Sequence, residues 1–200
     1  IPWNCYGRVD HFVEDGVKLA QKLADSGCMR IFLGLESMND GKLEFFNKRA
    51  TSDMNNVAVL CCHNAGIEVA AGWIIGAPED TFESLQDELE AFLALPMYSL
   101  DVNILSLNPG SVHSKKVLNG KIGLPLNQYS KEEQNHLINS GTINPDVEKY
   151  GVLEPWGQPT ICNNLNKQQL NEFAEYARDE LNRKFPVYCN KSIAKNQIFR

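Results

Sequence analysis

Strand-like and helix-like segments alternate through the first 110 residues of this chain. Short apolar stretches predict strands over residues 1–9, 30–36, 67–75 and 100–107. Their spacing of about 35 residues is the size of a strand and a helix joined by a right-handed crossover. The sequence therefore predicts an α/β fold with a parallel sheet. Four strands fall short of a full barrel of eight units, so we expect a partial TIM-type (β/α) barrel that corresponds to a second half.

Capping residues and helical spacing predict the helices between these strands. Asp10, Thr51 and Thr81 are expected to cap three helices, and a short helix with apolar contacts at Leu43 and Phe46 is expected over residues 39–48. The apolar positions expected to face the core are Val13, Val17, Ala20 and Ala24 after Asp10, Met54, Val57 and Cys61 after Thr51, and Leu85, Leu89, Phe92 and Leu93 after Thr81.

The character of the sequence changes after Gly110. Residues 111–165 are rich in Asn, Gly, Pro and Ser, which predicts a loop region with a weak helical pattern around residues 131–138. A capping box at residues 166–169 then opens a helix near residues 167–184, with one apolar face formed by Leu170, Phe173, Ala177 and Leu181. We therefore expect a core over residues 1–111 and an extension of loop and helix over residues 112–200.

Charge and composition disfavour several classes of protein. A net charge of −6 does not suit non-specific binding to nucleic acid. No apolar run reaches the roughly 20 residues that a membrane span requires, and the first residues do not resemble a signal peptide. The six cysteines lack metal-binding spacing and the four histidines are scattered, so we expect reduced thiols in a cytoplasmic protein. The chain opens in a strand without an initiator Met, which indicates a fragment of a longer protein.

Polar residues follow every predicted strand. The carboxyl ends of parallel strands lie at one edge of a sheet, where ligands bind. Taken singly, residues such as Asp10 and Ser37 are good helix caps. Taken together, the strand ends predict a site for a small polar ligand, formed by Arg8 and Asp10, Glu36 and Ser37, residues 76–79 and residues 108–111.

Several sequence blocks at these strand ends match one enzyme family in order and spacing. Residues 72–79 (Gly-Trp-Ile-Ile-Gly-Ala-Pro-Glu) fit the pattern G-x-I-x-G-x-x-E, and residues 27–37 fit G-C-x-x-I-x-x-G-x-E-S. Asn47, Lys48 and Thr51 fit N-K-x-x-T, residues 3–10 end in R-x-D, and residues 108–111 fit P-G-[ST]. Residues 1–111 thus resemble the second half of the (β/α)6 core of the radical S-adenosylmethionine (SAM) enzymes.

The resemblance implies roles for the polar residues in these blocks. Glu36, together with Ser37, would hydrogen-bond the ribose hydroxyls or the amino group of SAM, because a carboxylate accepts from two donors at once. Lys48 would pair with the methionyl carboxylate as a point charge. Arg8 would lie near the sulfonium and the same carboxylate.

The resemblance also assigns the strand over residues 67–75 to the adenine of SAM. Ile74 would pack on the adenine, and its backbone would contact the edge of the base. Gly72 and Gly76 would allow the backbone to approach the ligand closely. Glu79 is interpreted as a structural cap.

Two motifs of the family are absent from this chain, a cysteine pattern after its first strand and the G-G-E that follows its second. The cysteine pattern C-x-x-x-C-x-x-C holds the [4Fe–4S] cluster, and without its three thiolates there is no cluster site. We therefore expect the cluster ligands, with the first half of the core, upstream of residue 1. The blocks are closest to the cobalamin-dependent and methylthio-transferase-like branches.

The activity implied for the whole protein is cleavage of SAM to a 5′-deoxyadenosyl radical. The closest branches imply a methyltransferase or a carbon-skeleton enzyme with SAM, a [4Fe–4S] cluster and cobalamin as cofactors. Its expected partners are a small-molecule substrate, the missing N-terminal half of the core and a reductant protein.

Two other interpretations stay open. The chain could be a non-catalytic half-barrel that binds SAM or a partner protein, and its exposed sheet edges would then favour dimerisation or pairing. It could also be an unrelated half of a TIM-type barrel that uses Glu36 and Glu79 as acid and base, since paired carboxylates serve glycoside hydrolysis.

Overall fold

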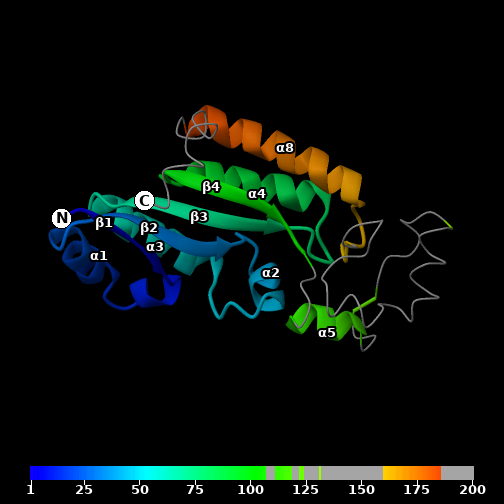
Figure 1. The fold of residues 1–200 in the computed structure, drawn as a ribbon, viewed down its shortest axis with the longest axis horizontal. Coiled ribbons are helices and arrows are strands. Elements are labelled where there is room, and N and C mark those ends of the chain that lie inside the picture. Colours follow the sequence, from blue (N-terminus) through cyan, green and yellow to red (C-terminus); the bar gives the residue numbers. More distant parts are fainter. Residues whose placement is uncertain (107–110, 119–121, 124–130, 132–159, 186–200) are drawn as a thin grey trace. The chain divides into compact units, whose positions relative to one another are not determined.

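The computed structural model describes residues 1–106, 111–118, 122–123, 131 and 160–185 (Figure 1). Strands and helices alternate along the chain, as the sequence predicts. The strands are β1 (Trp3–Gly7), β2 (Cys28–Glu36), β3 (Glu68–Ile75) and β4 (Ser99–Ile104). The helices are the 3-10 helix η1 (Val9–Phe12) and the α-helices α1 (Gly16–Asp25), α2 (Asp40–Phe45), α3 (Ser52–Asn64), α4 (Phe82–Ala94), α5 (Val112–Leu118) and α8 (Lys167–Lys184).

The chain divides into two compact units. The first contains Ile1–Ile74, Glu83–Asn103 and the chain from Phe173, and the second contains Ile75–Phe82 and the chain from Ile104 to Glu172. The division into residues 1–111 and 112–200 stays a prediction, because residues 107–110 and most residues from 119 to 159 lie outside the described part. Residues 132–138 of the weak helical pattern and the P-G segment at 108–110 lie there too.

The four strands form one sheet in the order β1-β2-β3-β4 (Figure 1). β1 and β3 both pair with β2 in parallel. The Tyr98 N–H donates to Val69 O and the Leu105 N–H donates to Ile75 O, both at 2.7 Å, so β4 runs in the same direction as β3. The predicted α/β fold with a parallel sheet is confirmed. Within the described residues the sheet is open, with β1 and β4 at its edges.

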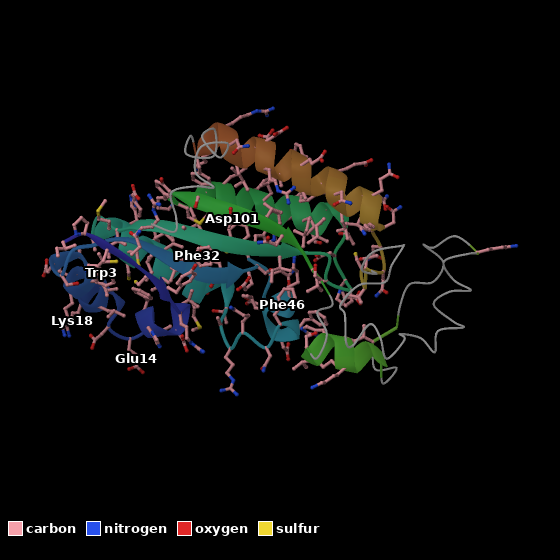
Figure 2. The ribbon with its side chains drawn as sticks, viewed as in Figure 1. Trp3, Glu14, Lys18, Phe32, Phe46 and Asp101 are labelled. Carbon is pink, nitrogen blue, oxygen red and sulfur yellow. The ribbon has the colours of Figure 1, made fainter. Side chains whose placement is uncertain are left out.

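The two faces of the sheet differ in exposure. On β2, Ile31, Leu33 and Leu35 are at most 2% exposed. The side chains between them point to the other face, because strand side chains alternate, and that face is half-exposed at Phe32 (Figure 2). Tyr6 on β1 is 86% exposed and its ring centre lies 5.3 Å from that of Phe32. We call this side of the sheet the open face.

The helix predicted after Asp10 begins later than expected. Asp10 lies inside η1 rather than at a cap, and α1 starts at Gly16. Val13 and Val17 are 50% and 73% exposed, so the predicted apolar face is wrong at these two positions, whereas Ala20 is fully buried as predicted. The side chain of Asp10 bonds Arg8 instead, which removes it as a cap.

The predicted cap of α3 is confirmed, but its predicted buried face is wrong. Thr51 Oγ1 accepts a hydrogen bond from the Met54 N–H at 3.3 Å. Val57 is 42% exposed. The buried positions of α3 are Asn55, Ala58, Val59 and Cys62. Because this buried stripe includes the polar residue Asn55, a search for apolar residues at helical spacing selects a neighbouring face of α3 instead.

The faces of the later helices follow the prediction more closely. Leu85, Leu89 and Phe92 of α4 are fully buried. At the start of α8 the Asn166 and Gln169 side chains each accept a hydrogen bond from the other's backbone N–H at 2.9 Å, which confirms the capping box. The predicted α8 face is buried at Leu170, Phe173, Ala177 and Leu181. No helix in the described part of the chain is long and apolar enough to cross a membrane.

Candidate functional site

An ion pair between Glu36 and Lys48 marks the carboxyl end of β2. Lys48 Nζ lies 3.0 Å from Glu36 Oε1, and the two side chains are 30% and 22% exposed. A Cβ atom at Gly34 would lie 2.7 Å from Glu36 Oε1 and 3.1 Å from Lys48 Nζ. Any larger residue at 34 would therefore displace the pair. Sequence resemblance singles out both charged residues, and the fold brings them together.

The end of α2 explains how Lys48 reaches Glu36. The Asn47 N–H donates to Glu44 O at 2.8 Å, and the Lys48 N–H donates to Leu43 O at 3.0 Å. Asn47 has a φ of 54°, so these bonds form a Schellman motif with Asn at the left-handed position. Asn tolerates that conformation better than most residues. Asn47 thus turns the chain at the helix end and directs Lys48 toward the sheet.

A pocket of about 360 Å³ lies beside this pair, within the first unit. Its volume is in the lower part of the range for small-molecule sites. Arg8 donates from Nε and Nη2 to the two carboxylate oxygens of Asp10 at 3.0 and 2.8 Å, and these hydrogen bonds lower the pKa of Asp10. The lining contains three cationic side chains, Arg8, Lys48 and Arg49, and one carboxylate, Asp10, so the pocket suits an anionic ligand. It is lined by Gly7, Arg8, Val9, Asp10, Gly34, Asn47, Lys48 and Arg49.

The backbone at Glu36 is strained. Glu36 has a φ of 64°, and the Ser37 N–H donates to Leu35 O at 2.8 Å across it. A three-residue turn with positive φ at its centre is the rare form of γ-turn. Among the described residues, the non-glycine residues with positive φ are Glu36, Asn47 and Arg49, which all lie at this site. Strain of roughly 1–3 kcal/mol per residue is found where a binding site requires it.

Ser37 does not face the pocket. It is fully buried, its hydroxyl donates to Glu88 Oε2, and the same hydroxyl accepts from the Asn39 N–H at 2.9 Å. The structure therefore separates Ser37 from the ligand role that the resemblance implies, and gives it a role in holding the turn after Glu36.

A buried ion pair anchors this turn, and sequence reasoning missed it. Lys42 Nζ lies 2.6 Å from Glu88 Oε1, with the side chains 7% and 4% exposed. Glu88 Oε2 also accepts from the Met38 N–H at 2.8 Å. One sequence signal exists, because Glu88 occupies a position in the same helical stripe as Leu85 and Phe92. A charged residue at a core-facing helical position needs a buried partner.

Gly72 and Ile74 extend the open face from Glu36 onto β3. A Cβ atom at Gly72 would lie 3.6 Å from Phe32 Cζ and 3.7 Å from Glu36 Oε2. Gly72 is itself buried, and because it has no side chain, Phe32 and the Glu36 carboxylate lie close over the β3 backbone. Ile74 lies two residues further along the strand and is half-buried. It shares the face of Gly72, since strand side chains repeat every two residues.

Gly76 lies in the second unit, where it forms a turn closed by Asp80. Gly76 has a φ of 94°, and the N–H groups of Gly76 and Ala77 donate to Asp80 Oδ2 at 2.7 and 3.0 Å. Asp80 is 2% exposed, whereas Glu79 is exposed and accepts from Asn163 Nδ2 at 3.4 Å. The structural role predicted for Glu79 therefore falls mainly to Asp80, its neighbour in the sequence.

The cysteines in the described residues are free thiols. Cys5 Sγ and Cys28 Sγ lie 4.0 Å apart. Burial raises the pKa of Cys5 to about 11 and that of Cys62 to about 12, with Cys28 adding to the shift of Cys5. Across the described part of the chain, no group of three or more His, Cys, Asp or Glu side chains could hold a metal ion.

Native alkylation is expected to distinguish Cys61 from Cys62. At pH 8 a thiol with a pKa of about 12 is ionised in about one molecule in ten thousand, and Cys62 is also fully buried. Cys61 is half-exposed and should react with iodoacetamide first. Fragment-ion mass spectrometry of the peptide that contains both residues measures this order. Denatured protein, in which both should react alike, is the control, and equal native rates would contradict the burial of Cys62.

Comparison with known proteins identifies relatives for part of their length. No family model matches the chain. An uncharacterized methyltransferase of Pyrococcus horikoshii is 28% identical over 111 residues, which is 56% of this chain and 24% of that protein. The bacteriochlorophyllide d C-8(2)-methyltransferase of Chlorobaculum tepidum is 26% identical over 150 residues, 73% of this chain and 33% of that protein. The chain thus spans between a quarter and a third of the length of these relatives.

Solved structures resemble this chain in fold. Coproporphyrinogen III oxidase (HemN) of Escherichia coli, a radical SAM enzyme, matches with a TM-score of 0.55 and 12% identity, covering 92% of this chain and 32% of that chain. Elp3 of Methanocaldococcus infernus matches with a TM-score of 0.54 and 14% identity, covering 90% and 42%. The radical SAM methyltransferase TsrM of Kitasatospora setae, solved with cobalamin and a [4Fe–4S] cluster, matches with a TM-score of 0.51 and 21% identity, covering 59% and 23%.

Proposed function

We propose that this chain, which has the fold of the radical SAM enzymes, is the part of such an enzyme that binds SAM. The observation that carries the proposal is the Glu36–Lys48 pair at the carboxyl end of β2. SAM has a ribose diol and an amino group that a carboxylate can accept from, and a methionyl carboxylate that an ammonium can bind. One ligand therefore complements both charges.

The roles of the individual residues follow from this arrangement. Glu36 accepts hydrogen bonds from the ribose hydroxyls or the amino group, and Lys48 pairs with the methionyl carboxylate. Arg8 adds positive charge at the rim of the same pocket. Gly72 lets the Glu36 carboxylate lie close to the β3 backbone, and Ile74 packs on the adenine. Ser37 shapes the turn without touching the ligand.

The second-unit glycine has a separate role in this proposal. Gly76 forms the turn that Asp80 closes, and its lack of a side chain is proposed to let the backbone of this turn approach a ligand.

The relatives support methyl transfer as the reaction class of the whole protein, because both are methyltransferases. A reduced [4Fe–4S] cluster elsewhere in the whole protein would supply the electron that cleaves SAM, and cobalamin would serve as a methyl carrier. The described residues contain no set of ligands for a cluster, so the cluster does not fit this part of the chain. We therefore assign its ligands, and the contacts to a reductant protein, to another part of the core. The substrate is proposed to be a small molecule.

Anaerobic purification of the full-length protein tests this function. We expect bound iron and sulfide, SAM binding by equilibrium dialysis, and 5′-deoxyadenosine when SAM and dithionite are added. Absence of SAM binding would overturn the proposal. SAM binding without iron and without cleavage would overturn the enzymatic part and favour the non-catalytic half-barrel.

A further inference from the structure

We propose that Asn55 is a positioning residue for Glu36. Its side-chain amide holds the backbone on both sides of Glu36, and so maintains the strained turn that presents the carboxylate to the ligand. This inference rests on the proposed function and deepens it, because it names a residue on which ligand affinity depends without contact to the ligand.

The contacts of Asn55 converge on the two residues that flank Glu36. Asn55 lies on α3 and is fully buried. Its Nδ2 donates to Leu35 O at 3.2 Å and to Ser37 O at 2.8 Å. The same Leu35 carbonyl accepts from the Ser37 N–H inside the γ-turn. One planar amide thus fixes the carbonyl groups before and after the left-handed residue.

The amide oxygen of Asn55 does not stabilise the fold. Asn55 Oδ1 is buried and has no hydrogen-bond partner among the described residues. A buried acceptor without a partner destabilises a fold, and an apolar residue of similar size would avoid that cost but would remove the donor to the Leu35 and Ser37 carbonyls. The presence of an amide at this core position is therefore explained by what Nδ2 holds.

A second helix holds the turn from its other side. Glu88 of α4 accepts from the Ser37 hydroxyl and from the Met38 N–H, and Lys42 fixes the Glu88 carboxylate. The backbone from Leu35 to Met38 is thereby held by side chains of α3 and α4. Glu36 cannot relax to an extended conformation without breaking these bonds. Its carboxylate is consequently pre-organised beside Gly34 before a ligand arrives.

The test compares Asn55→Leu with wild type in the full-length protein, using SAM itself as the probe. Without the two hydrogen bonds from Asn55, the strained turn at Glu36 should relax and its carboxylate should leave the position that binds SAM. We therefore expect the Kd for SAM to rise roughly tenfold. In a Glu36→Gly background, Asn55→Leu should have no further effect on the Kd. Glycine adopts a positive φ without strain, and no carboxylate remains to be positioned. Equilibrium dialysis measures all four proteins.

Two further variants separate positioning from general destabilisation. Val59→Ala, at another buried position of α3, should lower the unfolding midpoint and leave the Kd unchanged. If Asn55→Leu alone does not fold, the Glu36→Gly, Asn55→Leu double variant is expected to fold. Glycine adopts the positive φ at position 36 without strain, so the turn no longer depends on the Asn55 hydrogen bonds. A double variant as unstable as Asn55→Leu would contradict the inference.

The outcomes also distinguish this inference from the proposed function. If Glu36→Gln binds SAM with the wild-type Kd, the proposed SAM site is overturned, regardless of the Kd measured for Asn55→Leu. If Glu36→Gln weakens binding and Asn55→Leu does not, the site stands and the positioning role of Asn55 is overturned.

Discussion

Replacing Glu36 with Gln is expected to raise the Kd for SAM roughly 100-fold, because two charge-assisted hydrogen bonds to the ligand would be weakened together. The amide keeps the shape of the carboxylate, but it carries no charge and offers an acceptor on one side only. Lys48, 3.0 Å away, would also lose the partner that holds it at the pocket. Equilibrium dialysis of the full-length protein with SAM measures the change.

The matched control is Glu68→Gln at the other end of the sheet. Glu68 also forms an ion pair, with Arg30 Nη2 at 2.6 Å, and its side chain is 42% exposed. Its removal should leave the Kd unchanged, since Glu68 lies at the amino end of β3. A Kd that rises equally in both variants would point to a general effect of charge.

Loss of activity on a glycoside in both Glu36→Gln and Glu79→Gln would instead favour the interpretation in which these two carboxylates act as acid and base.

Replacing Lys42 with Met is expected to lower the free energy of unfolding by about 3–5 kcal/mol, the usual cost of leaving one buried charge without its partner. Glu88 is 4% exposed, and among the described residues the Ser37 hydroxyl and the Met38 N–H would remain as its hydrogen-bond donors. Met preserves most of the side-chain volume, so the effect reports the charge rather than a cavity. Urea unfolding followed by circular dichroism provides the measurement.

Two variants control for this effect. Lys18→Met breaks the exposed pair with Asp15, whose side chains are 77% and 73% exposed, and should change stability by less than about 1 kcal/mol. The double variant Lys42→Met, Glu88→Met should recover much of the lost stability, because two apolar residues of similar size can replace a buried pair. Wild-type stability in Lys42→Met would show that the pair does not anchor the turn.

Much of the fold and part of the site could be predicted from the sequence. The parallel α/β order follows from short apolar strands spaced by helices, and the α8 capping box follows from Asn166 and Gln169. Resemblance to radical SAM enzymes is confirmed in the fold, and its blocks single out Glu36 and Lys48, which lie together in space. The ligand contacts of these residues remain predictions.

Other features escaped the sequence for a physical reason. Asn55 and Glu88 are polar residues on helices, and a periodicity argument assigns such residues to solvent. Each is buried because its partner lies elsewhere: Asn55 holds carbonyls about 20 residues earlier, and Glu88 meets Ser37 across 51 residues. The buried face of α3 was misplaced for the same reason.

The sequence by itself determined the element types, several caps and the charged residues at the strand ends, because these depend on neighbours within a few positions. Only the tertiary structure decided that Glu36 takes a left-handed conformation, that Ser37 turns away from the pocket, and that Asp80 closes the turn after β3. For Glu36 and Ser37, the outcome depends on which distant side chains share the interior. Burial makes each of these partners obligatory, since a polar group removed from water needs a hydrogen bond within the fold.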